Sequence, residues 1–326
     1  MKSYTRRLQL TGGSTFILSL PSKWIKENNL GKGSEVTVEQ RGTQLLVSVS
    51  GAGHREVGKV LHLKGDELNH EDLVRVLTSI YISDFHTLTI SSSKYISQDI
   101  RDLIRKFSRF IMGVEIFEET SRSIVLQNVL DSSTFPLSYA LRRMSLNVQT
   151  MIEDTRTALI ENSRNLMENV ISRDDEVDRY QLYIYREVRS RTCDDANAIY
   201  FLIFSRILER IADHAVNICR MWTEGPDAAS ASPRELIDFI QLVREMYNEA
   251  SETFYSEKLE RLNEIIGKKG MIRGLKEEII RKFNASPQSY LIISCAEEAL
   301  RIGLYATDIA ELAMDKILGS TEEFSI

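Results

Sequence analysis

The sequence predicts a multi-domain protein, with a small all-β head (residues 1–53), a central α/β segment (54–132) and an all-α body (133–326). Three observations predict it. Short apolar stretches separated by glycine turns fill the first fifty positions. Strand-like and helix-like stretches then alternate as far as residue 131. Beyond residue 137, apolar residues recur every three or four positions through long segments, which is typical of amphipathic helices.

The head is predicted to fold as two hairpins joined by a short helix. The turn Thr11–Ser14 contains two glycines, and Pro21 opens a helix over Ser22–Asn28 because proline lacks only a donor that is free at a helix start. A domain with only four short strands can bury little apolar surface by itself. We therefore expect the head to dimerise. The expected strands are Tyr4–Leu10, Thr15–Leu20, Glu35–Gln40 and Gln44–Ser50.

The central segment is predicted to be a small sandwich in which a layer of helices covers a sheet. Its sequence contains no phosphate-binding loop, no dinucleotide-binding turn and no nucleophile motif. A structural spacer or dimer scaffold is therefore the expected role, and a small-molecule sensor is the alternative. The expected elements are strands Val57–Leu63, His86–Ser91, Val114–Glu118 and Ser123–Asn128, and helices His70–Ser83 and Gln98–Phe110.

The all-α body is predicted to contain two copies of a three-helix unit, residues 133–226 and 232–320. Val148–Thr155 echoes Val243–Ala250 at an offset of 95, and Arg210–Ile218 echoes Arg301–Ile309 at an offset of 91. The small and turn residues of Glu224–Ser232 form the linker. We expect the last helix to break or fray near its end. The expected helices lie near 137–162, 165–192, 196–223, 233–256, 258–283 and 287–318.

One apolar helix, near 201–222, carries the carboxylates Glu209 and Asp213 one turn apart. Side chains four positions apart share a helix face, where two like charges repel by roughly 0.2–0.5 kcal/mol. A bound cation would compensate, and such hard oxygen ligands suit Fe, Mg, Mn or Ca, with Zn as a further option. The alternative is two surface ion pairs, with Arg206 beside Glu209 and Arg210 beside Asp213, each contributing under ~1 kcal/mol.

In the second copy, Leu300 and Leu304 stand at the positions of the carboxylate pair, so we expect no second pair of the same kind. An enzymatic alternative is a metal-dependent hydrolase that uses Glu209 and Asp213 to activate water. The sequence offers no nucleophile and base pair for it, and His214 is expected to be a hydrogen-bonded structural residue. We therefore expect a protein that is not an enzyme.

Charge divides the chain unevenly. Residues 1–53 hold seven Lys and Arg against three Glu, a net charge of +4, whereas the remainder is at −10. A basic head on an acidic body predicts an anionic partner for the head alone. No apolar run reaches the length of a membrane span and the start lacks a signal peptide's core, so we expect a cytoplasmic protein without membrane insertion. Cys193, Cys219 and Cys295 lack metal-ligand spacing and are expected to pack in the core.

The stretch Leu208–Ile218, LERIADHAVNI, inside a duplicated three-helix bundle resembles the PhoU family of phosphate-uptake regulators. The resemblance implies a PhoU-like bundle with an E/D-x-x-x-D metal motif, matched here at Glu209 and Asp213. The second repeat departs from the motif, since only Asp308 offers a carboxylate there. Asp174–Asp178, placed before a helix over Arg179–Thr192, resembles the family's acidic pattern, so Asp175 and Asp178 are further ligand candidates. The alternative for these acids is a solvated helix start, which favours carboxylates.

The stretch Leu10–Ile25, LTGGSTFILSLPSKWI, followed by Leu30–Val36, LGKGSEV, resembles the AbrB/MazE/SpoVT class of swapped-hairpin DNA-binding domains. That resemblance implies a homodimer in which two chains interleave. It also implies DNA contacts from five side chains that would face the phosphate backbone or donate hydrogen bonds from the turn. These candidates are Arg6, Arg7, Ser14, Lys23 and Lys26.

The two resemblances together imply a DNA-binding transcriptional regulator of phosphate uptake and homeostasis. Its bundle would bind a divalent or trivalent metal and sense phosphate status, directly or through a transporter or sensor component. The alternatives are the hydrolase and a signalling adaptor whose head only dimerises or clamps a protein.

Overall fold

The computed structural model describes residues 4–41, 44–49, 58–63, 70–130, 135–191, 197–225, 232–256, 259, 261–286 and 289–319. The chain divides into two compact units, Met1–Glu56 and Val57–Ile326, which are described separately. Small hairpins, a mixed sheet with helices and a large helical bundle follow one another along the chain, and this confirms the predicted fold class. The exact borders proposed for the three segments stay predictions.

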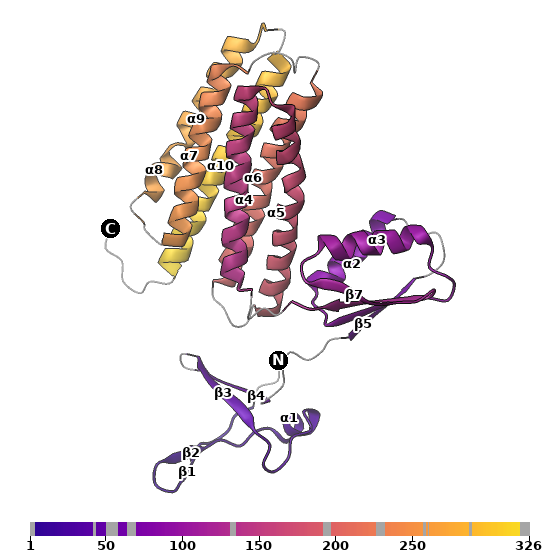
Figure 1. Ribbon diagram of the computed structural model, residues 1–326. Coiled ribbons are helices and arrows are strands. Elements are labelled where there is room, and N and C mark those ends of the chain that lie inside the picture. Colours follow the sequence, from indigo (N-terminus) through magenta and orange to yellow (C-terminus); the bar gives the residue numbers. More distant parts are fainter. Residues whose placement is uncertain are drawn as a thin grey trace. The chain divides into compact units, whose positions relative to one another are not determined.

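The first unit contains two antiparallel hairpins on either side of a short helix (Figure 1). At the tip of the first hairpin, Gly12 and Gly13 have φ values of 64° and 88°, which glycine adopts at no steric cost. The strand predicted over Tyr4–Leu10 is paired only from Gln9 onward. The elements are β1 (Gln9–Thr11), β2 (Thr15–Ile17), α1 (Ser22–Glu27), β3 (Val36–Arg41) and β4 (Gln44–Val49).

Apolar side chains of the first unit are exposed rather than packed in a core. None of its residues whose exposure is described is buried. The side chains of Leu8, Leu10 and Phe16 are 66%, 59% and 66% exposed. An apolar surface of this density on a small domain calls for a covering partner, because burial of apolar side chains is the main term that stabilises a fold. The other apolar side chains exposed by more than 40% are Tyr4, Ile17, Leu18, Val38, Leu45 and Leu46.

The second unit begins with a four-stranded sheet in the order β5-β6-β8-β7. Strands β5 and β6 are parallel and joined through α2, while β8 is antiparallel to both β6 and β7. Helices α2 and α3 cover one face of the sheet (Figure 1) and bury Leu88, Ile90 and Leu126 against it. The elements are β5 (Gly58–Leu63), α2 (His70–Ile82), β6 (Thr87–Ser92), α3 (Gln98–Phe110), β7 (Val114–Glu119) and β8 (Ser123–Asn128).

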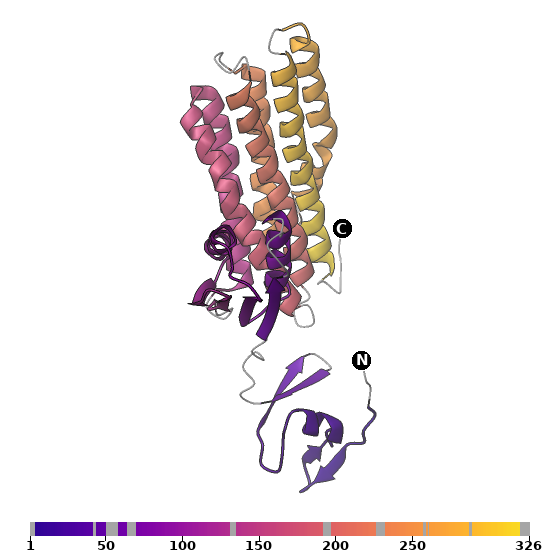
Figure 2. The same ribbon diagram turned by 90° about the vertical axis from the view of Figure 1, so that its right-hand side faces the viewer.

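The helical body shares one continuous core across both three-helix units. Helices α4, α5 and α6 lie beside one another, and α7, α9 and α10 continue the bundle in both views (Figures 1 and 2). Cys219 and Cys295 are buried, as expected for core packing, whereas Cys193 lies outside the described residues. The helices are α4 (Leu137–Glu161), α5 (Arg164–Arg191), α6 (Ala198–Glu224), α7 (Arg234–Ser256), α8 (Leu262–Gly267), α9 (Lys269–Phe283) and α10 (Ser289–Gly319).

Two helix predictions for the second copy were wrong. The single helix expected over 258–283 is divided at Lys268 into α8 and α9. Gly267 and Gly270 flank this division, and glycine weakens a helix by about 1 kcal/mol relative to alanine. The break expected near the end of α10 is absent from its described residues, because buried side chains as late as Lys316 hold the helix to the core.

A buried arginine on α5 connects the α/β segment to the bundle. Arg186 and Glu187 on α5 are 2% and 4% exposed, and Arg186 Nη2 donates to Glu187 Oε1 at 2.9 Å. The guanidinium of Arg186 lies 5.0 Å from the ring centre of Tyr81 on α2 and 5.3 Å from that of Tyr183. Helices α2 and α5 therefore meet through a cation–π contact as well as through apolar packing.

Within the part of the chain that the structure describes, no helix is both long and apolar enough to cross a membrane.

Candidate functional site

Four carboxylates gather where α5 packs against α6. Asp174 and Asp178 are four positions apart on α5, and Glu209 and Asp213 are four positions apart on α6. Each pair therefore lies on one face of its helix. The two helices are close neighbours along their length (Figures 1 and 2). We call these four residues the carboxylate cluster.

The charges of the carboxylate cluster act on one another. Burial, reinforced by the charges of Asp174, Glu209 and Asp213, raises the pKa of Asp178 to about 7. Burial and then the charge of Asp213 raise the pKa of Asp174 to about 6. The pKa of Glu209 is also raised, first by burial and then by Asp213. The cluster thus holds more negative charge than its surroundings neutralise.

Two oxygens of the carboxylate cluster are buried without a hydrogen-bond partner, namely Oδ1 of Asp174 and Oε2 of Glu209. The Arg210 guanidinium reaches Glu209 Oε2 at 3.6 Å, which is an ion pair but a long one. The predicted pairs of Arg206 with Glu209 and of Arg210 with Asp213 do not form among the described residues. Arg210 instead pairs with its sequence neighbour, so the repulsion within the cluster is only partly relieved.

The acidic run on α5 does not lie at a helix start. Helix α5 begins at Arg164, so residues Asp174–Asp178 occupy its middle, and the interpretation as a solvated helix start was wrong. Asp175 is exposed, although its charge contributes to the raised pKa of Asp178. Asp174, which sequence reasoning missed, shares the face of Asp178. The signal was available, since Asp174 and Asp178 repeat the spacing of Glu209 and Asp213.

The carboxylate cluster has the donor chemistry of a cation site. Carboxylate oxygens are the ligands of Mg, Ca, Mn and Fe ions, and a cation would supply the partner that the two orphaned oxygens lack. Among the described residues, no three His, Cys, Asp or Glu side chains converge closely enough to hold a metal ion as they stand. The residues present fit a metal in charge and oxygen content, and binding would have to draw the four carboxylates together.

Metal-free protein is expected to lose stability as the pH rises through about 6 and 7. Asp174 and Asp178 hold protons more tightly when folded than at the ordinary pKa of 3.8, so their contribution to stability is present below pH 3.8 and is lost as pH rises through their folded pKa values. The measurement is the Tm in chelator across this range for wild type and Asp178→Asn. The Tm of the variant relative to that of wild type should increase as the pH rises. A Tm difference that does not vary with pH would contradict the raised pKa.

His214, next to the carboxylate cluster in sequence, is engaged by the second repeat. Its Nδ1 lies 2.6 Å from Oε2 of Glu298 on α10, and Asn217 Nδ2 donates to the same oxygen at 3.2 Å. The ring stacks on Tyr305 with centroids 5.6 Å apart. His214 therefore links α6 to α10, and this confirms its expected role as a hydrogen-bonded structural residue.

The candidate DNA-binding side chains all belong to the first unit and all are exposed. Arg6 and Arg7 precede β1, and Ser14 stands in the turn between β1 and β2. Lys23 and Lys26 lie on α1, where Lys23 Nζ is 3.6 Å from a carboxylate oxygen of Glu27. Exposed side chains of this kind can reach an anionic surface, and their role as DNA contacts stays a prediction.

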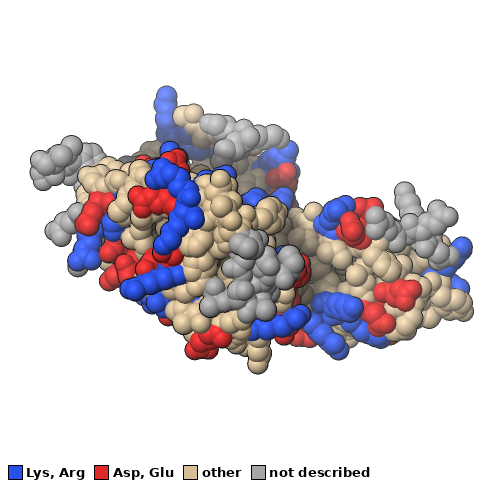
Figure 3. All heavy atoms as spheres, turned by 90° about the horizontal axis from the view of Figure 1, so that it is seen from above, with Lys and Arg blue, Asp and Glu red and all other residues tan. Residues whose placement is uncertain are grey.

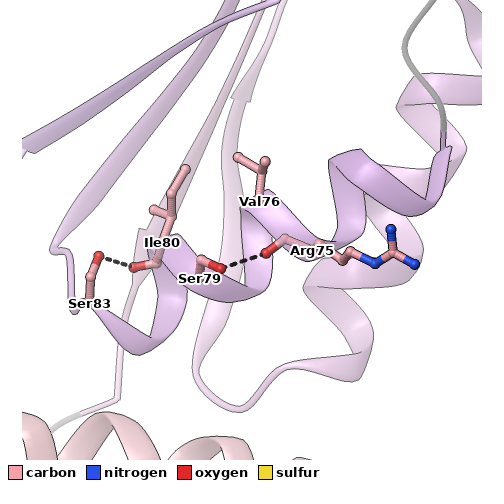
Figure 4. A pocket seen from close by; sticks show the side chains of 5 residues that line it. All are labelled: Arg75, Val76, Ser79, Ile80 and Ser83. Carbon is pink, nitrogen blue, oxygen red and sulfur yellow. Dashed lines mark hydrogen bonds between the residues drawn. The ribbon is translucent and has the colours of Figure 1, made fainter.

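A shallow hollow of about 300 Å³ lies along α2 (Figure 4). The hydroxyls of Ser79 and Ser83 donate to the backbone carbonyls of Arg75 and Ile80, and Lys59 Nζ on β5 donates to the Ser83 hydroxyl. Apart from the Arg75 side chain, Val76 and Ile80 give the hollow an apolar lining. The role of the α/β segment, as a spacer or dimer scaffold or as a small-molecule sensor, stays a prediction. Elsewhere, Figure 3 shows acidic and basic side chains side by side on the face that it draws.

Comparison with known proteins identifies two domains in the chain. Residues 141–221 match the PhoU domain, and residues 9–49 match the family described as antidote-toxin recognition MazE, bacterial antitoxin. The structure of PhoU from Pseudomonas aeruginosa superposes with a TM-score of 0.53 at 20% identity, covering 58% of this chain and 99% of that one. The phosphate transport system regulatory protein PhoU from Streptococcus pneumoniae gives 0.51 at 16%, with 58% and 96% covered. No match to a curated protein was found.

These findings define the class of protein. The chain has a helical body with the PhoU fold, preceded by a MazE-type domain, in the order that the sequence predicted. The carboxylate cluster falls within the matched PhoU domain, and the five exposed candidate side chains fall within or just before the MazE-type domain.

Proposed function

We propose that this protein is a non-enzymatic, DNA-binding regulator of phosphate uptake and homeostasis. The observation that carries the proposal is the union of a PhoU domain and a MazE-type domain in one chain. The relative from Streptococcus pneumoniae is described as a regulatory protein of the phosphate transport system. The head would read DNA in the cytoplasm, and the body would report phosphate status to it, directly or through a transporter or sensor component.

The head is proposed to act as a homodimer. Its exposed apolar side chains, among them Leu8, Leu10 and Phe16, would be covered by a second copy. Pairing two heads would double the net charge of +4 on one surface, which favours an anionic polymer as the ligand. Arg6, Arg7 and their partner-chain equivalents would then neutralise DNA phosphates.

The body is proposed to bind a divalent or trivalent metal at the carboxylate cluster. The residues that would hold it are Asp174, Asp178, Glu209 and Asp213, whereas Asp175 is exposed beside them. When bound, the metal would neutralise the cluster and offer open positions to an anion such as phosphate. A hydrolytic role has less support, because the sequence offers no nucleophile and base pair.

Removing the charges of Arg6 and Arg7 is expected to weaken DNA binding more than tenfold and to flatten its salt dependence. Each phosphate contact adds about 0.9 to the steepness with which log affinity falls against log salt. A dimer that loses four contacts should therefore show a slope that is shallower by about 3.6. The measurement is the affinity of Arg6→Gln/Arg7→Gln for DNA upstream of phosphate-transport genes from the same genome, at several salt concentrations.

The matched control for this experiment is Arg281→Gln, which removes one positive charge from an exposed site on α9. It should bind DNA as wild type does, and a chain without residues 1–53 should not bind at all. DNA binding that survives loss of the head, or an equal loss in the control, would refute the proposed DNA-reading role.

A further inference from the structure

A second hollow, of about 320 Å³, lies between α9 and α10 in the second repeat. Its size is near the lower end of the ~300–1,000 Å³ that small-molecule pockets occupy. Three of its six lining side chains are cationic and one is a tyrosine. The lining residues are Lys269, Arg273, Arg301, Leu304, Tyr305 and Asp308.

The α10 side of this hollow corresponds to the α6 side of the carboxylate cluster. The offset of 91 that relates the two helices places Leu304 at the position of Asp213 and Leu300 at that of Glu209. Tyr305 takes the position of His214. One wall of the cluster has therefore lost both of its negative charges in the second repeat.

The α9 side corresponds to the α5 side in the same way. The offset of 95 that relates α4 to α7 places Lys269 at the position of Asp174 and Arg273 at that of Asp178. Helix α9 packs against α10 as α5 packs against α6. In this alignment two cations, also four positions apart, stand where the first repeat has two carboxylates, so the hollow favours an anion over a cation.

The cations of the hollow are only weakly engaged. Lys269 Nζ is 2.6 Å from Glu311, and Arg301 Nε is 3.1 Å from Glu297, but these pairs are one-third to one-half exposed. Exposed pairs contribute under ~1 kcal/mol, so a ligand can replace either carboxylate. Arg273 is exposed and forms no ion pair within the described part of the chain.

One carboxylate opposes an anionic ligand here. Asp308 is half-buried, and burial raises its pKa, while Lys269 acts in the opposite direction. Its negative charge is outnumbered by three cations in the lining. Tyr305 adds an apolar ring beside Leu304, on which the organic part of a ligand can rest.

We propose that this hollow is a binding site for the phosphate group of inorganic phosphate or of a small phosphorylated metabolite. Arg273 and Lys269 would neutralise its charge and Arg301 would donate hydrogen bonds to its oxygens, in keeping with the preference of guanidinium groups for phosphate. The proposal requires neither the DNA-binding head nor a metal at the carboxylate cluster. Its failure would therefore leave the proposed regulation of phosphate uptake untouched.

The test is isothermal titration calorimetry of the full-length, chelator-treated protein with inorganic phosphate and, separately, with adenosine monophosphate. Arg273→Gln should weaken binding about tenfold, because it removes a cation of the hollow that no carboxylate of the described residues already neutralises. Asp308→Asn should tighten it, since it removes the opposing charge. Arg281→Gln, on the same helix outside the hollow, is the matched control and should bind as wild type does. Binding of inorganic phosphate identifies the free anion as the source, and binding of the nucleotide alone identifies a metabolite.

Three outcomes would overturn the site. The first is no heat of binding for either probe at a concentration of about 10 mM, which is roughly ten times the Kd of a weak, millimolar site. The second is an equal loss in Arg273→Gln and Arg281→Gln, which would indicate attraction by net charge alone. The third is binding that appears only after metal is added back and is lost in Glu209→Gln, which would locate the anion at the carboxylate cluster instead.

Discussion

Replacing Asp178 and Glu209 by their amides is expected to stabilise the metal-free protein and to abolish its stabilisation by metal. The two carboxylates repel Asp174 and Asp213, and burial makes their charged forms unfavourable, so neutral amides should raise the Tm in chelator. The same change removes the negative charge that a cation needs. Wild-type protein at a metal concentration of 100 times Kd would gain about 2.7 kcal/mol. In a domain of this size that gain corresponds to a rise in Tm of about 5–10 °C.

The measurement is thermal unfolding of wild type and of Asp178→Asn/Glu209→Gln, first in chelator and then with Mn, Mg, Ca, Zn or Fe ions. Asp175→Asn is the matched control, because Asp175 is exposed beside the cluster and should keep the response to metal. A control that loses the response as fully as the double variant would make Asp175 a ligand in its own right. A wild-type Tm that no metal raises would exclude the proposed metal site.

The sequence predicts local structure well where a repeating pattern is strong. The helix over Gln98–Phe110 and the strand over Ser123–Asn128 have the bounds that were predicted. It fails where a small local preference decides the outcome, as at Lys268, where two nearby glycines divide a helix whose apolar pattern is continuous. An apolar pattern reports which face is buried, but not where the backbone ceases to be helical.

The candidate metal site was half predicted, for a physical reason. Glu209 and Asp213 stand out because an apolar helix carries them, whereas Asp174 is one of four acids in a run of five residues. Only the packing of α5 on α6 shows which acids of that run face the pair. The head presents the opposite case. Its turn and strand pattern was readable, but the apolar side chains that it leaves exposed became visible only in the structure.

Glu187→Ala is expected to destabilise the second unit by about 3–5 kcal/mol, because it leaves the buried guanidinium of Arg186 without its counter-charge. Arg186 Nη1 is already buried without a hydrogen-bond partner, so loss of the carboxylate leaves a second nitrogen of the guanidinium unsatisfied. The rings of Tyr81 and Tyr183 hold it in place but replace only part of a carboxylate's interaction. The measurement is urea unfolding at equilibrium, compared with wild type.

The control is the double variant Arg186→Met/Glu187→Leu, which replaces both charges with apolar groups of similar length. Such replacements of a buried pair are often neutral or stabilising, so the double variant should regain most of the stability that Glu187→Ala loses. A loss below about 1 kcal/mol in the single variant would mean that the pair is solvated rather than buried. Since α5 carries half of the carboxylate cluster and also contacts α2, Arg186 ties the α/β segment, through Tyr81, to the helix on which the proposed metal acts.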